Sequence, residues 1–166
     1  RVPRRARLAY RDVASATNRL TLIAAIIPAR AVTTHTLFCL KTPLSLDAQY
    51  VLCGLLNSYV ANYLVRFRVN THVTASLVSR LHVPFMNHAD PAFLRMQTLV
   101  RELVRNDKPE ETEAYAELQA VVARLYGLGS QDLEHVLSTF PLVPEAVKAA
   151  TLTRYNELSD YEPRRR

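Results

Sequence analysis

Short runs of apolar and β-branched residues, separated by polar connectors, fill the first 42 residues of the chain. The runs are Leu8–Tyr10, which precedes the polar pair at residues 11–12, then Thr21–Ile27 and Val32–Leu40, and the two polar connectors cover residues 15–19 and 29–31. Apolar runs of this length that end at polar residues or at proline are typical of strands. The pattern therefore predicts a small β-sheet at the start of the chain.

The apolar pattern becomes helical after about residue 46. Asp47 is placed to cap a long helix that ends near Arg68, because apolar residues recur every three or four positions between these two residues. The segment from Val73 to Leu81 is predicted as either a short helix or an extended segment. Pro84 ends this segment, because the residue before a proline is biased away from the helical conformation.

The second half of the chain carries two helical stripes joined by a short connector. Asp90 and Pro91 are typical of a helix start, and the helix behind them has an apolar stripe that reaches Val104. A turn at residues 106–109 leads to a second helix, whose stripe covers residues 115–125. Because the connector is short, the two helices are expected to pack as an antiparallel hairpin.

Two shorter helical signals complete the expected fold. Ser130 is placed to cap a short helix, and Pro144 starts a last helix that ends near Leu158. The expected fold class is α+β, with a small N-terminal β-sheet followed by a mostly helical C-terminal half. Residues 1–84 are expected to form a β-rich, basic part with one long helix (about 47–68), residues 85–160 a helical support subdomain, and residues 161–166 a disordered tail.

The net charge of +6 is unevenly distributed along the chain. Residues 1–84 contain 11 Lys and Arg against 2 Asp and Glu, whereas residues 85–166 contain 10 against 13. A basic half joined to a mildly acidic half indicates that only the first half faces a polyanion such as nucleic acid. The alternative is that the basic surface serves solubility alone.

Cysteine usage and hydropathy bear on the compartment. Cys39 and Cys53 both have apolar neighbours in sequence, so they are expected to be small core residues of a cytoplasmic protein rather than a disulfide or a metal pair. The longest mostly apolar stretch, residues 50–65, is interrupted by polar residues and makes a poor membrane span, so no membrane partner is expected. Because the chain begins at Arg1 without a methionine, it is expected to be part of a longer protein.

The residues that catalytic and cofactor sites need are scarce or scattered. Three glycines are too few for a phosphate-binding loop, the five histidines form no helical metal pair, and no Gly-x-Ser-x-Gly motif occurs. The sequence therefore predicts no catalytic residue, metal or cofactor in this chain, and no small-molecule substrate. A solvated helix face, rather than an acid–base pair, is expected for Glu110, Glu111, Glu113 and Glu117.

Polar residues that suit DNA contacts gather in the connectors of the basic half. Arginine suits guanine and phosphate, asparagine suits adenine, and threonine and histidine add short donors and acceptors. Asp12 either orients Arg11 or accepts from a cytosine amino group. The alternative for each residue is a solvated surface group or a local backbone cap. The expected DNA-contacting residues are Arg11, Asp12, Thr17, Asn18, Arg19, Arg30, His35 and Thr36 in a first group, and Arg66, Arg68, Asn70 and His72 in a second.

Three aromatic residues bear on which form of DNA is expected. Tyr59, Tyr63 and Phe67 share the apolar face of the expected long helix, and they are interpreted as core residues. Proteins that bind single strands stack bases on exposed aromatic side chains. With these three residues in the core, the sequence favours double-stranded DNA.

Several stretches of the chain occur in an order that resembles a known family. This order is similar to the C-terminal specificity region of adenine-specific DNA methyltransferases of Type IIG and single-chain Type I restriction–modification systems, which have a Taq-type target-recognition domain. The resemblance spans about residues 7–145. It rests on Arg11–Thr21, Ile23–Pro28, Thr34–Thr36, Leu55–Tyr59, Tyr63–Arg66, Val69–His72, Leu125–Leu128 and Leu133–Pro141.

The resemblance implies a bacterial parent enzyme in which this chain is the DNA-reading part. Its partners would be double-stranded DNA and an upstream methyltransferase domain that binds S-adenosylmethionine, often accompanied by a nuclease. The family's Asn/Asp-Pro-Pro-Tyr/Phe methylation motif, glycine-rich cofactor loop and nuclease signature do not occur in this sequence. Only target recognition is therefore carried over, and the first part of the recognition domain is expected to lie outside the chain.

Two other classes of function stay open. In the first, the apolar stripes of the helical half serve a structural or interaction module, which packs on the catalytic domain or a partner subunit without reading DNA. In the second, the chain is an enzyme in its own right, which the absent catalytic motifs disfavour. Sequence-specific recognition of double-stranded DNA, without catalysis, is the preferred hypothesis.

Overall fold

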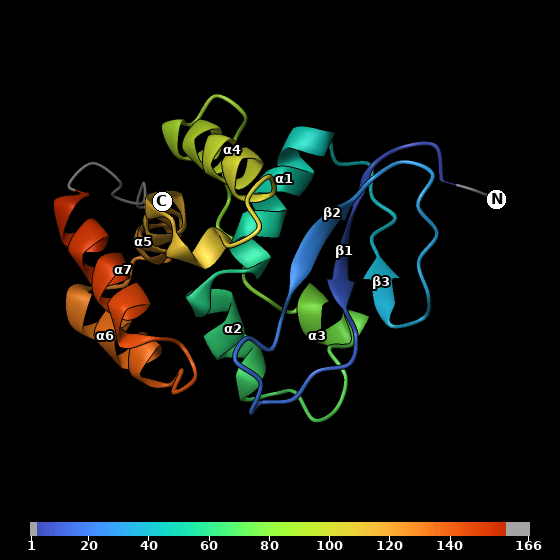
Figure 1. The fold of residues 1–166 in the computed structure, drawn as a ribbon. Coiled ribbons are helices and arrows are strands. Elements are labelled where there is room, and N and C mark those ends of the chain that lie inside the picture. The colour runs from blue at the N-terminus through green and yellow to red at the C-terminus, as the bar shows by residue number, and fades with distance from the viewer. Residues whose placement is uncertain (1–2, 159–166) are drawn as a thin grey trace.

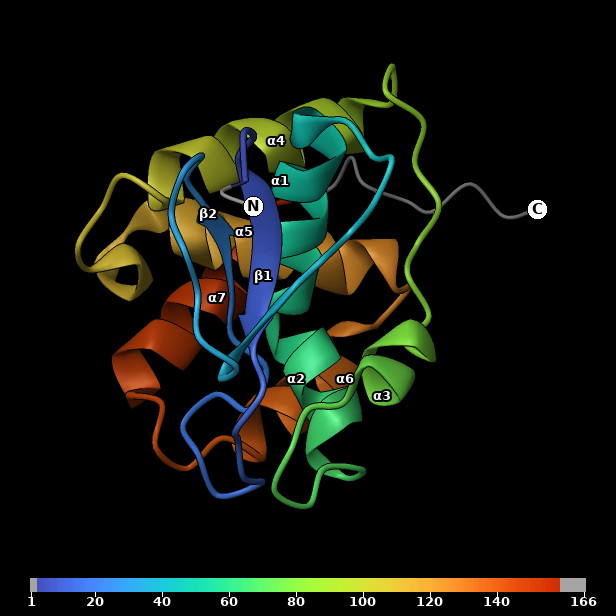
Figure 2. The same ribbon diagram turned by 90° about the vertical axis from the view of Figure 1, so that its right-hand side faces the viewer.

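A computed structural model of the protein describes residues 3–158, so the expected disordered tail at residues 161–166 lies outside the described residues. The fold is α+β, with an antiparallel sheet at the N-terminal end and helices over the rest of the described chain (Figures 1 and 2). The elements are β1 (Arg7–Arg11), β2 (Ala24–Ile27), β3 (Leu37–Cys39), α1 (Leu46–Leu56), α2 (Tyr59–Arg66), α3 (Ala75–Ser79), α4 (Pro91–Leu103), the 3-10 helix η1 (Pro109–Glu111), α5 (Glu113–Leu125), α6 (Ser130–Ser138) and α7 (Glu145–Glu157).

The sheet has the strand order β2-β1-β3, with both neighbours antiparallel to the central strand β1. Leu8 lies opposite Ile26, and Tyr10 lies between Ala24 and Phe38. The rings of Tyr10 and Phe38 stack with their centroids 5.2 Å apart. Helix α1 packs on β1 and β2 and contacts α4, so it joins the sheet to the helical part.

The second strand begins three residues later than the pattern predicts. The backbone N–H groups of Thr21 and Leu22 both donate to Oδ1 of Asn62 at 2.8 Å, in place of a strand partner. Asn57 then exchanges hydrogen bonds with the backbone of Ala24, where β2 starts. The prediction of a strand from residue 21 was therefore wrong, because two side-chain amides from the neighbouring helices satisfy this backbone.

The third strand is also shorter than predicted. Only Leu37–Cys39 pairs with β1, while residues 28–36 form a loop that carries the chain from one end of the sheet to the other. Leu37 N donates to Thr34 O at 3.2 Å, which closes a turn directly before the strand. Threonine and valine favour strands but do not impose one, because β propensity depends on an available partner.

The predicted long helix over 47–68 is two helices, and this prediction was wrong. Ser58 interrupts it, because its Oγ donates to Leu55 O at 2.7 Å and accepts from Ala61 N at 3.1 Å, which caps the start of α2. The cap of α1 is Ser45, whose Oγ accepts from Ala48 N, and Asp47 lies in the first turn instead. Serine is a strong N-cap residue, so a helix end inside the apolar stripe has a local cause.

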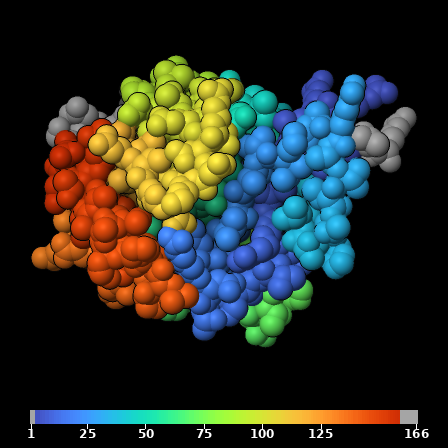
Figure 3. Space-filling model, viewed as in Figure 1, coloured from blue at the N-terminus to red at the C-terminus, as the bar shows by residue number. Residues whose placement is uncertain are grey.

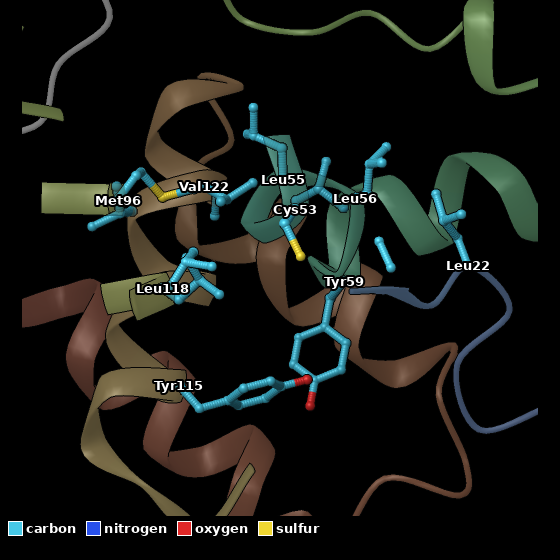
Figure 4. Close-up of a cluster of buried hydrophobic side chains, with 14 of the residues drawn as sticks. Leu22, Cys53, Leu55, Leu56, Tyr59, Met96, Tyr115, Leu118 and Val122 are labelled. Atoms are coloured by element: carbon cyan, nitrogen blue, oxygen red, sulfur yellow. The ribbon is translucent and has the colours of Figure 1, made fainter. Parts of the chain in front are cut away.

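The helical half packs around α5. Residues 114–123 of α5 are all buried, and the helix packs against both α4 and α7. One hydrophobic cluster extends from Leu8 in the sheet to Tyr155 in α7, so the two predicted parts of the chain share a single core. Figure 4 shows part of this core, in which Leu55 of α1 lies near Val122 of α5, and Leu118 of α5 lies near Met96 of α4.

Two further expectations about buried groups are corrected. Glu117 is not solvated: its carboxylate is buried, accepts from Arg95 Nε, and lies 2.7 Å from Arg154 Nη2. Hydrogen bonds from Arg95 and Arg154 hold the pKa of Glu117 below its usual value, against the opposing effect of burial. Both cysteines are free thiols, but only Cys53 is a core residue. Burial raises its pKa to about 12, whereas Cys39 is half-buried.

Candidate nucleic-acid interface

Three connecting segments meet at one end of the molecule. They are the loop that follows β1, the turn that precedes β3 and the connection between α2 and α3, and both ribbon views place them together (Figures 1 and 2). We call this surface the loop end, and it consists of residues 12–19, 34–36 and 67–73. Loops held by a rigid scaffold are common positions for binding residues.

Backbone hydrogen bonds tie the three segments of the loop end to one another. Asp12 N donates to Thr36 O at 2.9 Å, and Val73 N donates to Asp12 O at 2.7 Å. Ala14 N donates to Thr71 O at 3.1 Å, beside an isolated bridge between Val13 and His72. The loop after β1 is therefore held on both sides by the other two segments.

Asp12 forms a hydrogen bond with His72 rather than orienting Arg11. His72 Nδ1 lies 3.0 Å from Asp12 Oδ2, and both side chains are partly exposed. Arg11 Nη2 instead reaches Asn18 Oδ1 at 3.4 Å and Leu20 O at 3.3 Å. The prediction that Asp12 orients Arg11 is therefore wrong. Arg11 instead stabilises the loop through its hydrogen bonds to Asn18 and Leu20.

The side chains of the loop after β1 differ in exposure and in hydrogen bonding. Asn18 Oδ1 accepts from Ser15 N at 2.8 Å, so this amide closes a local turn. Thr17 and Arg19 are exposed, and Arg19 Nη2 forms an ion pair with Glu110 in η1. Asn18 and Arg19 are thus both at the loop end, but each has an intramolecular partner.

Arg66 lies at the end of α2 and is half-buried. Its Nη2 donates to Asn18 O at 2.8 Å and to Arg19 O at 3.2 Å, and its Nη1 donates to Thr139 O. Its guanidinium carbon lies 4.1 Å from the centroid of the Phe140 ring. Burial lowers the pKa of Arg66 from its ordinary value.

The remaining predicted residues divide by position. His35, Thr36, Arg68, Asn70 and His72 are exposed at the loop end. Arg30, in contrast, lies at the opposite end of the sheet: its N–H donates to Pro3 O at 2.8 Å, close to the start of β1, and its φ angle is 65°. The structure therefore brings together every predicted site residue except Arg30.

The loop end also has an exposed aromatic residue that the sequence pattern placed in the core. Phe67 is 68% exposed, whereas Tyr59 is buried and Tyr63 is half-buried. Phe67 is the C-cap residue of α2, so the helical stripe that predicted its burial has already ended. Its ring packs edge-on against Tyr63, with centroids 4.9 Å apart. The prediction that Phe67 is a core residue was therefore wrong, and the preference for double-stranded DNA over a single strand rests on Tyr59 and Tyr63 alone.

Sequence reasoning missed Glu110 as part of this surface. Glu110 is 91 residues from Arg19, and no local pattern connects the two. Within residues 3–158, no group of three or more His, Cys, Asp or Glu side chains could hold a metal ion, and no helix is long and apolar enough to cross a membrane. Comparison of the chain with protein-family models, curated proteins and solved structures finds no match.

Proposed function

We propose that this chain is a recognition module for double-stranded DNA and that the loop end is the surface that reads it. The observation that carries the proposal is the convergence of three polar loops, cross-linked by backbone hydrogen bonds, on the basic half of the chain. A pre-organised surface binds with less loss of loop entropy than a flexible one. Such a surface suits the reading of a rigid duplex.

The exposed residues of the loop end provide the chemistry that such reading needs. Arg68 is suited to a phosphate or to guanine, and Asn70 to the edge of adenine. Asp12 and His72 are hydrogen-bonded to each other, and the backbone of Asp12 is bonded to that of Thr36, so three polar residues lie close together on this surface. Phosphate contacts would position the module, and one or two contacts to base edges would supply specificity.

The resemblance to specificity regions extends the proposal to a restriction–modification adenine methyltransferase. In that setting the chain reads the target, while an upstream domain binds S-adenosylmethionine and transfers the methyl group. No catalytic step is assigned to residues of this chain. The proposed partners are the DNA duplex and that methyltransferase domain.

A salt titration tests the DNA-binding proposal. The anisotropy of a fluorescein-labelled mixed-sequence duplex would be measured at increasing KCl concentration, with residues 1–166 of the protein. The logarithm of the association constant falls linearly with the logarithm of the salt concentration, and each lost phosphate contact reduces the magnitude of this slope by about 0.9. We expect this loss for Arg68→Ala, and no change for the control Arg105→Ala, an exposed arginine outside the loop end. Absence of binding, or equal effects of both variants, would contradict the proposal.

A second candidate, an interaction module, is favoured by a groove on the helical half. The groove lies between α5 and α7 and has a volume of about 610 Å³. The exposed residues Ala146 and Ala150 line it. The acidic residues along it are Glu111, Glu113 and Glu157. Ala150→Arg would obstruct this groove without touching the loop end. If the groove binds the catalytic domain, this variant lowers methylation by the parent enzyme but leaves the DNA affinity of residues 1–166 unchanged. Unchanged methylation would remove this candidate.

A further inference from the structure

Arg66 joins two parts of the molecule that are far apart in the sequence. Two of its hydrogen bonds go to the carbonyl groups of Asn18 and Arg19, which belong to the loop end. A third goes to Thr139 O, directly after α6, and the guanidinium lies over the ring of Phe140, which is fully buried. A planar guanidinium suits this position, because it donates in several fixed directions and stacks on an aromatic face.

A second contact ties the same loop to the helical half. Arg19 pairs with Glu110 in η1, next to the start of α5. In the space-filling view, the surface of the N-terminal loops (blue) lies directly against yellow and orange surfaces of the helical half (Figure 3). The loop after β1 is therefore held directly by Glu110 of η1 and by Arg66 of α2, which in turn contacts the segment after α6.

The arrangement leaves Arg66 poorly placed to contact a phosphate. Both terminal nitrogens already donate to backbone carbonyls, and Nε is buried from solvent. Arg68, two residues further on, is exposed and lies in the same loop region. The two arginines thus have the same charge and nearly the same position, but different surroundings.

We infer that Arg66 is a positioning residue, which sets the conformation of the loop at residues 15–20 from the helical half instead of contacting DNA. This inference rests on the proposed function only for its effect on DNA reading. The hydrogen bonds of Arg66 hold the backbone at Asn18 and Arg19, and with it the side chains of Thr17 and Arg19. Loss of these bonds alters which sequences are accepted, while the number of phosphate contacts stays the same.

Hydrogen exchange of the free protein tests the positioning role without DNA. Removal of charge-assisted hydrogen bonds to two carbonyls is expected to speed amide exchange in residues 15–20 of Arg66→Ala by about tenfold. Arg66→Lys keeps the positive charge but loses the two separate donor nitrogens of the guanidinium, so its amide exchange in residues 15–20 is expected to be intermediate between wild type and Arg66→Ala. The control Arg68→Ala leaves exchange in this segment unchanged. Amides of α5 serve as the internal reference, because global destabilisation would speed their exchange as well.

Binding to a pool of duplexes with a randomised central segment tests the consequence for reading. Arg66→Ala is expected to reduce the enrichment of preferred sequences by about tenfold and to leave the salt dependence of the affinity unchanged. Arg68→Ala, in contrast, is expected to reduce the magnitude of the salt slope by about 0.9. A lower slope for Arg66→Ala together with unchanged exchange in residues 15–20 would overturn the inference. If wild-type protein bound no duplex, the proposed function would fail, while the exchange comparison would still decide the role of Arg66.

Discussion

Asn62 takes the place of a neighbouring strand for Leu22. Its Oδ1 accepts from Leu22 N at 2.8 Å, and its Nδ2 donates to Leu22 O at 3.1 Å. Both residues are fully buried, and the same Oδ1 also accepts from Thr21 N. This contact fixes the backbone directly after the loop at residues 12–19, so it helps to hold the loop end in place.

Replacement of Asn62 by alanine is expected to destabilise the protein strongly. It leaves two buried backbone N–H groups without an acceptor, and each such group costs about 1–3 kcal/mol. We therefore expect the free energy of unfolding in urea to fall by at least about 2 kcal/mol. The control Asn70→Ala changes an exposed asparagine, and is expected to shift it by less than about 0.5 kcal/mol. Equal stability of the two variants would contradict this role of Asn62.

Gly54 lies where α1 packs tightly against α4 and α5. A Cβ atom at this position would lie 2.6 Å from Cγ2 of Val100 and 3.1 Å from both Leu118 Cδ1 and Met96 Cε. Overpacking costs about 1–3 kcal/mol, which exceeds the gain of about 1 kcal/mol from alanine in a helix. Gly54→Ala is therefore expected to lower the midpoint of thermal unfolding. A midpoint equal to or above that of the wild type would contradict this packing.

The stability of the protein is expected to depend on Glu117 in acid. The pKa of Glu117 is lowered in the folded protein, chiefly by the hydrogen bond from Arg95. The Glu117 carboxylate therefore contributes fully to the free energy of unfolding above the ordinary carboxyl pKa of about 4.3. This contribution is lost as the pH falls through the lower pKa that Glu117 has in the folded protein. Urea unfolding of Glu117→Gln and wild type from neutral to acid pH measures this contribution.

The stability difference between the wild type and Glu117→Gln should be largest near neutral pH and shrink below the ordinary carboxyl pKa. Glu113→Gln provides a matched control, because Glu113 is exposed on the same helix. Its curve should differ from that of the wild type by less than about 1 kcal/mol at every pH, because an exposed first-turn carboxylate interacts only weakly with the helix N-terminus. A difference between wild type and Glu117→Gln that stays constant with pH would rule out the ion pairs as its cause.

The helices of the C-terminal half could be predicted because their signals are local. The start of α4 at Pro91 and the start of α7 directly after Pro144 follow from residues at the helix ends themselves. The start of α2 also has a local signal, because its N-cap Ser58 is a serine between two apolar turns. The continuous stripe around it outweighed that signal in the prediction of one long helix.

The details of the candidate site depend on contacts that no local pattern encodes. The clustering of polar residues in the connectors predicts which loops matter, but not how their side chains are used. Arg66 and Asn18 are 48 residues apart, and Arg19 and Glu110 are 91 apart. Only the packing of the helical half against the N-terminal loops decides that Arg66 points inward and Arg68 outward.

Chemical-shift mapping of the backbone amides is the most direct test of DNA recognition by the loop end. A short mixed-sequence duplex would be added to isotope-labelled protein, and the shift of each amide followed. We expect the largest changes within residues 12–19, 34–36 and 67–73, and little change along α5 and α7. Changes confined to the groove between α5 and α7, or no changes at saturating duplex, would contradict the proposal.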